Sequence, residues 1–183
     1  MTSPSPLETE LKLRIPATAP YGPLLAALGF RETIPAQPEA SVLWDRRGEL
    51  RAGGSALRLR RYAGQARLTW KGPKIPDALL KIRPELETGV EDGPAMEGIL
   101  RALGFEPVMV LEKVRAVWSR KELVACLDET PFGCYLELEG DPLAIRGAME
   151  GLGLAPDRAE PRSYPELYQA HGLGQILPDG VRP

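Results

Sequence analysis

The chain has 183 residues, of which 43% are hydrophobic and 26% are charged, a composition typical of one globular domain with a sizeable core. Its 23 basic and 25 acidic residues almost cancel, which gives no indication of nucleic-acid binding, and no apolar run is long enough to cross a bilayer. We therefore predict a single domain over residues 1–183, with its core at about 7–170 and a C-terminal tail at 171–183. The polar start of the chain lacks the features of a secretory signal, and two cysteines are too few for a disulfide framework, so we expect a cytoplasmic protein without nucleic-acid or membrane partners.

Charged and apolar residues alternate along several segments, which is the pattern of strands whose two faces see different surroundings. In the first segment Glu8, Glu10 and Lys12 leave one face, because successive side chains of a strand point to opposite sides. Leu11 and Leu13 leave the other face. The predicted strands, of which the second and the seventh show the weakest alternation, are 7–15, 42–46, 56–62, 68–71, 82–87, 113–118, 123–128 and 136–139.

Apolar residues at helical spacing predict three helices, at 21–28, 94–103 and 143–152. The first two end at glycines that are suited to a C-cap. The glycine-rich segment 47–54 lacks the Gly-Lys-Ser/Thr ending of a phosphate-binding P-loop, and we interpret it as a hairpin connection.

An internal repeat organises these elements. The segment 25–30, with the sequence LAALGF, resembles 100–105, with the sequence LRALGF, and each follows a strand that carries a Glu-x-Glu pair. Three predicted strands follow each copy, so the chain contains two βαβββ units. Eight mostly antiparallel strands can close into a barrel wide enough for one small ligand. We therefore predict an α+β fold in which a closed eight-stranded barrel is surrounded by its helices.

The charged residues of these strands come as clustered pairs, such as Glu8 with Glu10 and Arg58 with Arg60. A sheet that exposes its charged face to water is the ordinary alternative, but charges on such a face would be free to vary in type. We instead expect a hydrated tunnel around an ionic ligand, because buried charges are tolerated only when they are paired, hydrated or ligated. The side chains predicted to point inward are Glu8, Glu10, Lys12, Arg58, Arg60, Lys71, Arg83, Glu85, Glu87, Lys113, Arg115, Asp128, Glu137 and Glu139.

Short motifs along the chain match one family, in the family's order. They are ETELK at 8–12, LRLR at 57–60, TWKGP at 69–73, RPELE at 83–87, KVR at 113–115, GCYLELE at 133–139 and SYPEL at 163–167. By these motifs the chain resembles the CYTH superfamily, which includes class IV adenylyl cyclases, thiamine triphosphatases and inorganic triphosphatases. The resemblance covers most of the chain. It implies a tunnel that binds a triphosphate-bearing small molecule through divalent metal ions and basic side chains.

Ligand chemistry suggests a role for each inward-facing residue of such a tunnel. Mg²⁺ and Mn²⁺ prefer oxygen ligands, and the predicted metal ligands are Glu8, Glu10, Asp128, Glu137 and Glu139. The predicted triphosphate-binding residues are Lys12, Arg58, Arg60, Lys71, Arg83, Lys113 and Arg115. In catalysis, a second metal ion, or Glu85 or Glu87, would position the attacking water. Lys113 and Arg115 would stabilise the charge on the transferred group. The plainer alternative for Arg83 is an internal salt bridge with Glu85 or Glu87.

The expected activity is metal-dependent hydrolysis of inorganic tripolyphosphate or of an organic triphosphate such as thiamine triphosphate. The alternatives are a class IV adenylyl cyclase, which converts ATP to cyclic AMP and diphosphate, and a non-catalytic polyphosphate- or nucleotide-binding module. Hydrolysis is favoured over cyclisation because the charged face carries few aromatic side chains that could stack on adenine, Tyr62 and Tyr135 being the main candidates. In addition, the residues before Glu8 lack the histidine or aromatic lead-in of many cyclase-like members. A binding module would not need the paired carboxylates. The sequence leaves open whether the protein is a monomer or a homodimer.

Overall fold

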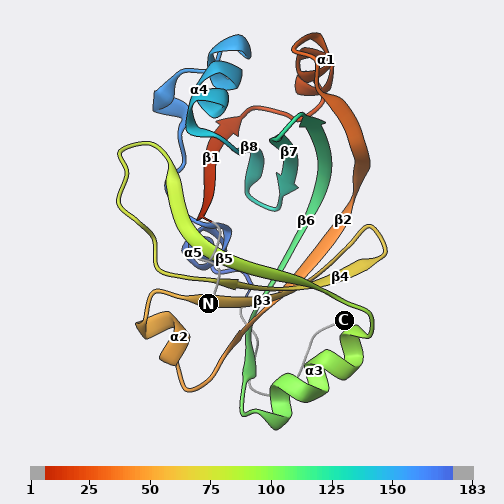
Figure 1. Cartoon of the computed structure of the whole chain (residues 1–183), viewed down its shortest axis with the longest axis vertical. Helices are drawn as coiled ribbons and strands as arrows, with labels where there is room; N and C mark the ends of the chain where they lie inside the picture. The colour runs from red at the N-terminus through yellow and green to blue at the C-terminus, as the bar shows by residue number, and fades with distance from the viewer. Residues whose placement is uncertain (1–6, 175–183) are drawn as a thin grey trace, which may run out of the picture.

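The computed structural model describes residues 7–174, whose strands close into a barrel (Figure 1). The strands are β1 (Leu7–Ile15), β2 (Arg31–Asp45), β3 (Ala56–Tyr62), β4 (Gln65–Lys71), β5 (Lys81–Val90), β6 (Glu106–Arg120), β7 (Leu123–Thr130) and β8 (Gly133–Glu139). The helices are α1 (Tyr21–Ala27), α2 (Glu49–Ala52), α3 (Gly93–Ala102), α4 (Pro142–Gly151) and α5 (Tyr164–Ala170), with a 3₁₀ turn at Pro156–Arg158. Residues 175–183 of the predicted tail lie outside the described range.

The order of strands around the barrel confirms the predicted fold. Neighbours follow the order β1-β5-β4-β3-β2-β6-β7-β8, and every pairing is antiparallel. The two βαβββ units are β1-α1-β2-β3-β4 and β5-α3-β6-β7-β8, with α2 inserted between β2 and β3. The first strands of the two units pair with each other, as do the second strands, so pairing between the units closes the ring.

The repeated LGF sequence forms the same helix ending in both units. Gly29 and Gly104 have φ angles of +83° and +81°, a left-handed conformation that costs glycine little because it has no Cβ. The N–H of Phe30 donates to the carbonyl oxygen of Leu25 at 3.0 Å, and the equivalent bond after α3 is 2.9 Å long. These bonds define a Schellman motif, which satisfies carbonyls left free at a helix end. The predicted glycine C-caps are thus confirmed.

Two strands are much longer than predicted. β2 and β6 each have 15 residues, whereas the sequence pattern indicated only 42–46 and 113–118. The first half of β2 is mostly exposed on both faces, so no charged and apolar alternation marks it. Shifts in register between Glu32 and Ile34, and between Ile34 and Gln37, also interrupt its pairing with β6.

The segment 47–54, predicted as a plain hairpin connection, contains the short helix α2. The carboxylate of Asp45 accepts hydrogen bonds from the backbone N–H groups of Arg46, Leu50 and Arg51, at 2.7 to 3.1 Å. These bonds satisfy donors at the start of the helix, which compensates for its shortness. Asp45 therefore turns the loop into a helix at the mouth of the barrel.

The apolar faces of the strands point outward and are largely covered by helices. On one half of the barrel α1 and α4 pack over β1, β7 and β8, where Leu13 and Ile145 are 0% exposed. On the other half Leu100 of α3 packs in one cluster with Trp44 of β2, and the two residues are 4% and 2% exposed. Each fully buried leucine contributes about 2 kcal/mol. The cover is incomplete on β5, where Leu86 is 55% exposed. Among residues 7–174, no helix has the length and apolar character needed to cross a membrane.

Candidate functional site

The barrel surrounds a cavity of about 1470 Å³, which is lined by the charged faces of the strands and by residues of α2 and α5. All the side chains predicted to point inward line this cavity except Asp128, which is 0% exposed and lies behind its wall. The predicted direction of the charged faces is therefore confirmed.

Most acidic side chains of the cavity lie on one wall, and Arg58 and Arg60 lie on the other. In a closed ring of eight strands the fourth neighbour lies across the lumen, which places β8, β1 and β5 opposite β3, β2 and β6. The first wall carries Glu8, Glu10, Glu85, Glu87, Glu137 and Glu139. The second wall carries Arg58, Arg60, Lys113 and Arg115, together with Glu39. A polyanion held between metal ions on one side and basic groups on the other matches this separation.

Lysines pair with the acids of the first wall. The Nζ atom of Lys71 lies 2.5 Å from Oε1 of Glu85 and 3.2 Å from Oε2 of Glu8. Lys81 pairs with Glu10 at 2.9 Å. Lys12, which is 1% exposed, lies 3.4 Å from a carboxylate oxygen of Glu137, and burial lowers the pKa of Lys12 to about 8.

The carboxyl groups of this wall crowd one another. Burial and a hydrogen bond shared with Glu8 raise the pKa of Glu85 to about 8. Burial and the charge of Glu8 raise the pKa of Glu139 to about 7. Burial also opposes the ionisation of Glu8, but its hydrogen bond with Glu85 and the charge of Lys71 outweigh that effect and lower its pKa to about 2. Because a divalent cation would relieve the same repulsion that proton sharing relieves here, this donor set fits a hard metal ion.

The acids are not gathered into a finished metal site. Within the described residues no three acidic side chains are arranged as a group that would hold a metal ion. Mg²⁺ is usually bound by one or two carboxylates plus phosphate oxygens and water. A metal on this wall would therefore take part of its coordination from the substrate.

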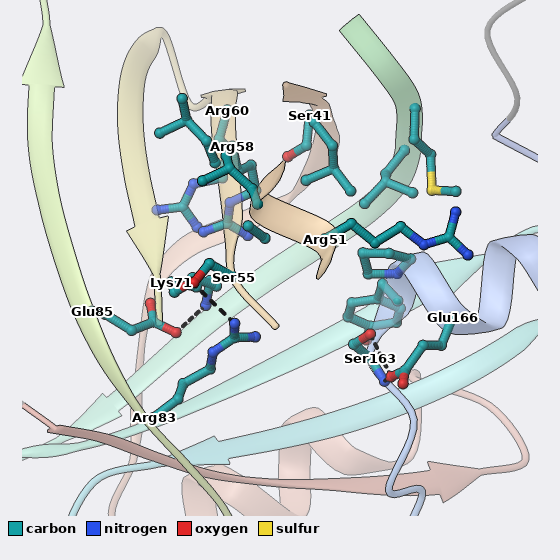
Figure 2. A pocket seen from close by; sticks show the side chains of 18 of the residues that line it. Ser41, Arg51, Ser55, Arg58, Arg60, Lys71, Arg83, Glu85, Ser163 and Glu166 are labelled. Carbon is teal, nitrogen blue, oxygen red and sulfur yellow. Dashed lines mark hydrogen bonds and ion pairs between the residues drawn. The ribbon is translucent and has the colours of Figure 1, made fainter. Parts of the chain in front are cut away.

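Arg58 and Arg60 of the opposite wall are held loosely. Arg60 lies 3.8 Å from Glu39 and 3.5 Å from Glu87, and Arg58 lies 4.0 Å from Glu87. Strong ion pairs of this type have distances of about 2.7–2.9 Å. Nε of Arg58 and the hydroxyl of Ser41 are buried without a hydrogen-bond partner among residues 7–174. Figure 2 shows the Ser41 hydroxyl turned toward these two arginines.

Asp128, predicted as a metal ligand, is instead saturated by protein donors. Its Oδ1 accepts from Nε of Arg115 at 2.6 Å, and its Oδ2 accepts from the other end of the same guanidinium at 2.5 Å. Oδ2 also accepts from Lys113 at 3.0 Å and from the hydroxyl of Tyr164 at 2.5 Å. Arg115 is 7% exposed and further contacts Glu137 at 2.5 Å. These contacts favour a structural role for Asp128 and Arg115.

The hydrogen bonds of Arg83 go to the backbone. Its guanidinium donates to the carbonyl oxygen of Gly72 at 2.8 and 2.5 Å and to that of Lys71 at 3.2 Å. Figure 2 shows it beside the pair formed by Lys71 and Glu85. Glu87 bonds instead to Thr69, at 2.7 Å. Arg83 therefore fixes the turn after Lys71, and its contact with phosphate stays a prediction.

The sequence interpretation missed several wall residues. Lys81 lies two residues before Arg83, so the period-two alternation of that strand places both on the same face. Extending the second predicted strand towards its N-terminus by the same alternation would have found Glu39 and Ser41. Tyr164 belongs to the matched SYPEL motif, but no periodicity points it into the cavity. The two tyrosines proposed to stack on adenine, Tyr62 and Tyr135, are not among the residues that line the cavity, so that expectation is wrong.

Comparisons with known proteins agree with this architecture. The family model of the CYTH domain matches residues 6–142. A Methanocaldococcus jannaschii protein named as a putative adenylate cyclase is 32% identical over 134 residues, which are 73% of this chain and 76% of that protein.

Solved structures share the fold. A Pyrococcus horikoshii protein is 27% identical, with a TM-score of 0.72 over 90% of this chain and 99% of its own. A Hippeastrum protein is 22% identical. It is named as a putative adenylyl cyclase and is described as having a dominant triphosphatase activity. It has a TM-score of 0.68 over 93% of this chain and 98% of its own.

Proposed function

The chain belongs to the CYTH domain family, and from this premise we propose that it is a metal-dependent triphosphate hydrolase. Its substrate is inorganic tripolyphosphate or an organic triphosphate such as thiamine triphosphate. The observation that carries the proposal is that one closed cavity gathers most of its acids on β8, β1 and β5 and carries the loosely held Arg58 and Arg60 on β3. A triphosphate that arrives with divalent cations needs carboxylates for the metal ions and arginines for the phosphate oxygens, so neither the acids nor the arginines alone would suit it.

The acidic wall is the proposed metal site. Glu8, Glu10 and Glu139 would hold Mg²⁺ or Mn²⁺, with Glu137 at the buried end of the set. The bound ion would neutralise phosphate charge and act as a Lewis acid. Asp128 is not included because its oxygens already accept hydrogen bonds from Arg115, Lys113 and Tyr164.

The basic wall would hold the phosphate chain. Arg58 and Arg60 can turn from their long contacts toward phosphoryl oxygens at little cost, and Lys113 would stabilise the charge on the transferred group. Glu85 or Glu87 would orient a water molecule in line with the terminal phosphorus. Attack by that water forms the new P–O bond, and the bond to the bridging oxygen breaks, so that diphosphate or a diphosphate ester leaves.

Adenylyl cyclase activity is the second candidate, because the Methanocaldococcus relative carries that name. Tyr62 and Tyr135, the two tyrosines named as candidates to stack on an adenine ring, do not line the cavity. The Hippeastrum protein, which is also named as a cyclase, is described as having a dominant triphosphatase activity.

Product identification tests the proposal. Purified protein would be incubated with tripolyphosphate, thiamine triphosphate and ATP in turn, with Mg²⁺ or Mn²⁺ and with a chelator. We expect metal-dependent phosphate release from tripolyphosphate or thiamine triphosphate, and none with the chelator. Cyclic AMP and diphosphate from ATP would instead establish the cyclase, and metal-independent binding without any product would identify a binding module.

Ser41 offers a sharper test of the basic wall. A buried hydroxyl without a partner costs stability, so its presence is explained if it donates to a ligand. We expect Ser41→Ala to raise the KM for tripolyphosphate about tenfold, as for a lost hydrogen bond to a charged group, and to leave the melting temperature unchanged or higher.

The matched control is Ser119→Ala in β6, a serine of the same sheet that does not line the cavity. Steady-state kinetics and thermal unfolding of both variants decide the point. A wild-type KM in Ser41→Ala, or a fall in stability without a change in KM, would remove Ser41 from the binding wall.

A further inference from the structure

Tyr164 enters the barrel from α5 and is fixed in one orientation. It is the first residue of α5, just after the cap residue Ser163, whose capping box with Glu166 begins the helix. Its hydroxyl donates to Oδ2 of Asp128 at 2.5 Å. The edge of Tyr135 packs against its ring, with the centroids 5.7 Å apart and the planes at 86°. The ring is therefore held at both its polar and its apolar end.

Two lysines of the cavity lie over this ring. Nζ of Lys12 is 3.6 Å from the ring centroid and Nζ of Lys113 is 4.1 Å from it. Both distances are well within the roughly 6 Å at which a cation is attracted to an aromatic face. The side chains of Lys12 and Lys113 are only 1% and 8% exposed, so water does little to weaken the attraction. A single aromatic ring thus contacts ammonium groups from β1 and β6, strands that do not pair with each other.

The ring of Tyr164 restrains the positions of the two ammonium groups. Two like charges close together repel, and each ammonium group has a carboxylate nearby, Glu137 at 3.4 Å from Lys12 and Asp128 at 3.0 Å from Lys113. Lys113 already donates to Asp128, whereas Lys12 would be free, without the ring, to turn fully onto Glu137. With the ring, both ammonium groups stay within 4.1 Å of its centroid.

From this geometry we propose that Tyr164 is a positioning residue, which holds the ammonium groups of Lys12 and Lys113 together to receive adjacent oxygens of the triphosphate. The inference rests on the proposed function for the identity of the ligand. The position of the lysines over the ring can be measured without any ligand.

Three variants separate this role from simple packing of α5. Tyr164→Leu removes the ring and the hydroxyl, and Tyr164→Phe keeps the ring but removes the hydroxyl. Leu167→Ala weakens the same helix at a residue that is 0% exposed and does not line the cavity. Binding of tripolyphosphate would be measured by calorimetry with a chelator present, so that no turnover occurs.

We expect Tyr164→Leu to weaken tripolyphosphate binding by at least about tenfold, and Tyr164→Phe to stay within about threefold of the wild type. Leu167→Ala should lower the melting temperature while keeping its affinity within about threefold. Equal losses of affinity in Tyr164→Leu and Tyr164→Phe would overturn the role of the ring. Equal losses in Tyr164→Leu and Leu167→Ala would show that only the docking of α5 matters.

An NMR measurement on the free protein completes the test. Side-chain protons of a lysine held over an aromatic face are shifted upfield by its ring current. We expect two such lysines in the wild type and in Tyr164→Phe, and their loss in Tyr164→Leu and in the respective variants Lys12→Met and Lys113→Met. If the wild type bound no tripolyphosphate either with the chelator or with Mg²⁺, the proposed function would fail. The absence of the shifted lysine signals would overturn the positioning role by itself.

Discussion

Replacing Glu10 with glutamine is expected to lower metal-dependent turnover of the triphosphate by at least about 100-fold while leaving the fold intact. Glu10 lies on the acidic wall beside Glu139, its partner in the pairing of β1 with β8, and its only described ion pair is with Lys81. Glutamine preserves the volume and can still accept a hydrogen bond from that lysine. It removes one negative charge from the proposed metal site, which weakens the attraction for a hard cation.

The measurement is turnover as a function of Mg²⁺ or Mn²⁺ concentration, together with the melting temperature. We expect Glu10→Gln to require more metal and to melt within about 3 °C of the wild type. Glu91→Gln, at an exposed acid between β5 and α3, is the matched control and should behave like the wild type. Unchanged turnover and unchanged metal dependence in Glu10→Gln would exclude this residue from the site.

Asp128→Asn is expected to act mainly on stability, lowering the free energy of unfolding by about 3–5 kcal/mol. The carboxylate is 0% exposed and accepts from Arg115, Lys113 and Tyr164. Asparagine has nearly the same size, but it carries no charge, so the buried cations lose their main counterion. For a chain of this length the loss corresponds to a fall of about 6–20 °C in melting temperature.

Thermal unfolding of the metal-free protein distinguishes this role from metal binding. A structural anchor predicts the loss of stability with a chelator present, whereas a metal ligand predicts a normal melting temperature and a loss only of metal affinity. Asp157→Asn, at an exposed aspartate of the 3₁₀ turn, is the control for the change of charge. The second outcome would restore the prediction made from the sequence.

The sequence pattern predicted the strands of the barrel because the alternation that marks a strand involves only residues that are neighbours along the chain. A strand with period two assigns every second residue to one face, so the alternation in 7–15 was enough to place Glu8, Glu10 and Lys12 on the inner side. The repeated LGF ending marks where α1 and α3 stop, and the positive φ angles of Gly29 and Gly104 give the physical reason. Where the alternation was missing, as in the exposed first half of β2, the strand was predicted too short.

The roles of individual site residues could not be assigned in this way. Arg83 and Asp128 have charges and positions suited to a phosphate contact and a metal ligand, and the sequence interpretation gave them those roles. The structure shows Arg83 donating to the carbonyl oxygen of Gly72, and Asp128 accepting from Arg115 and Tyr164. Whether a charged side chain is free for a ligand depends on the partners that other strands bring to it.

The sequence by itself determined the number of strands, their order along the chain, the two repeated units and which face of each strand points inward. Each of these follows from the spacing between neighbours along the chain. Only the tertiary structure decided that acids and arginines face each other across the lumen, since that depends on the strand order of the closed ring. It also brought Tyr164 to the side chains of Lys12 and Lys113, which are far from it in sequence. Such contacts are set by barrel closure, strand register and the docking of α5, and local periodicity carries no information about any of them.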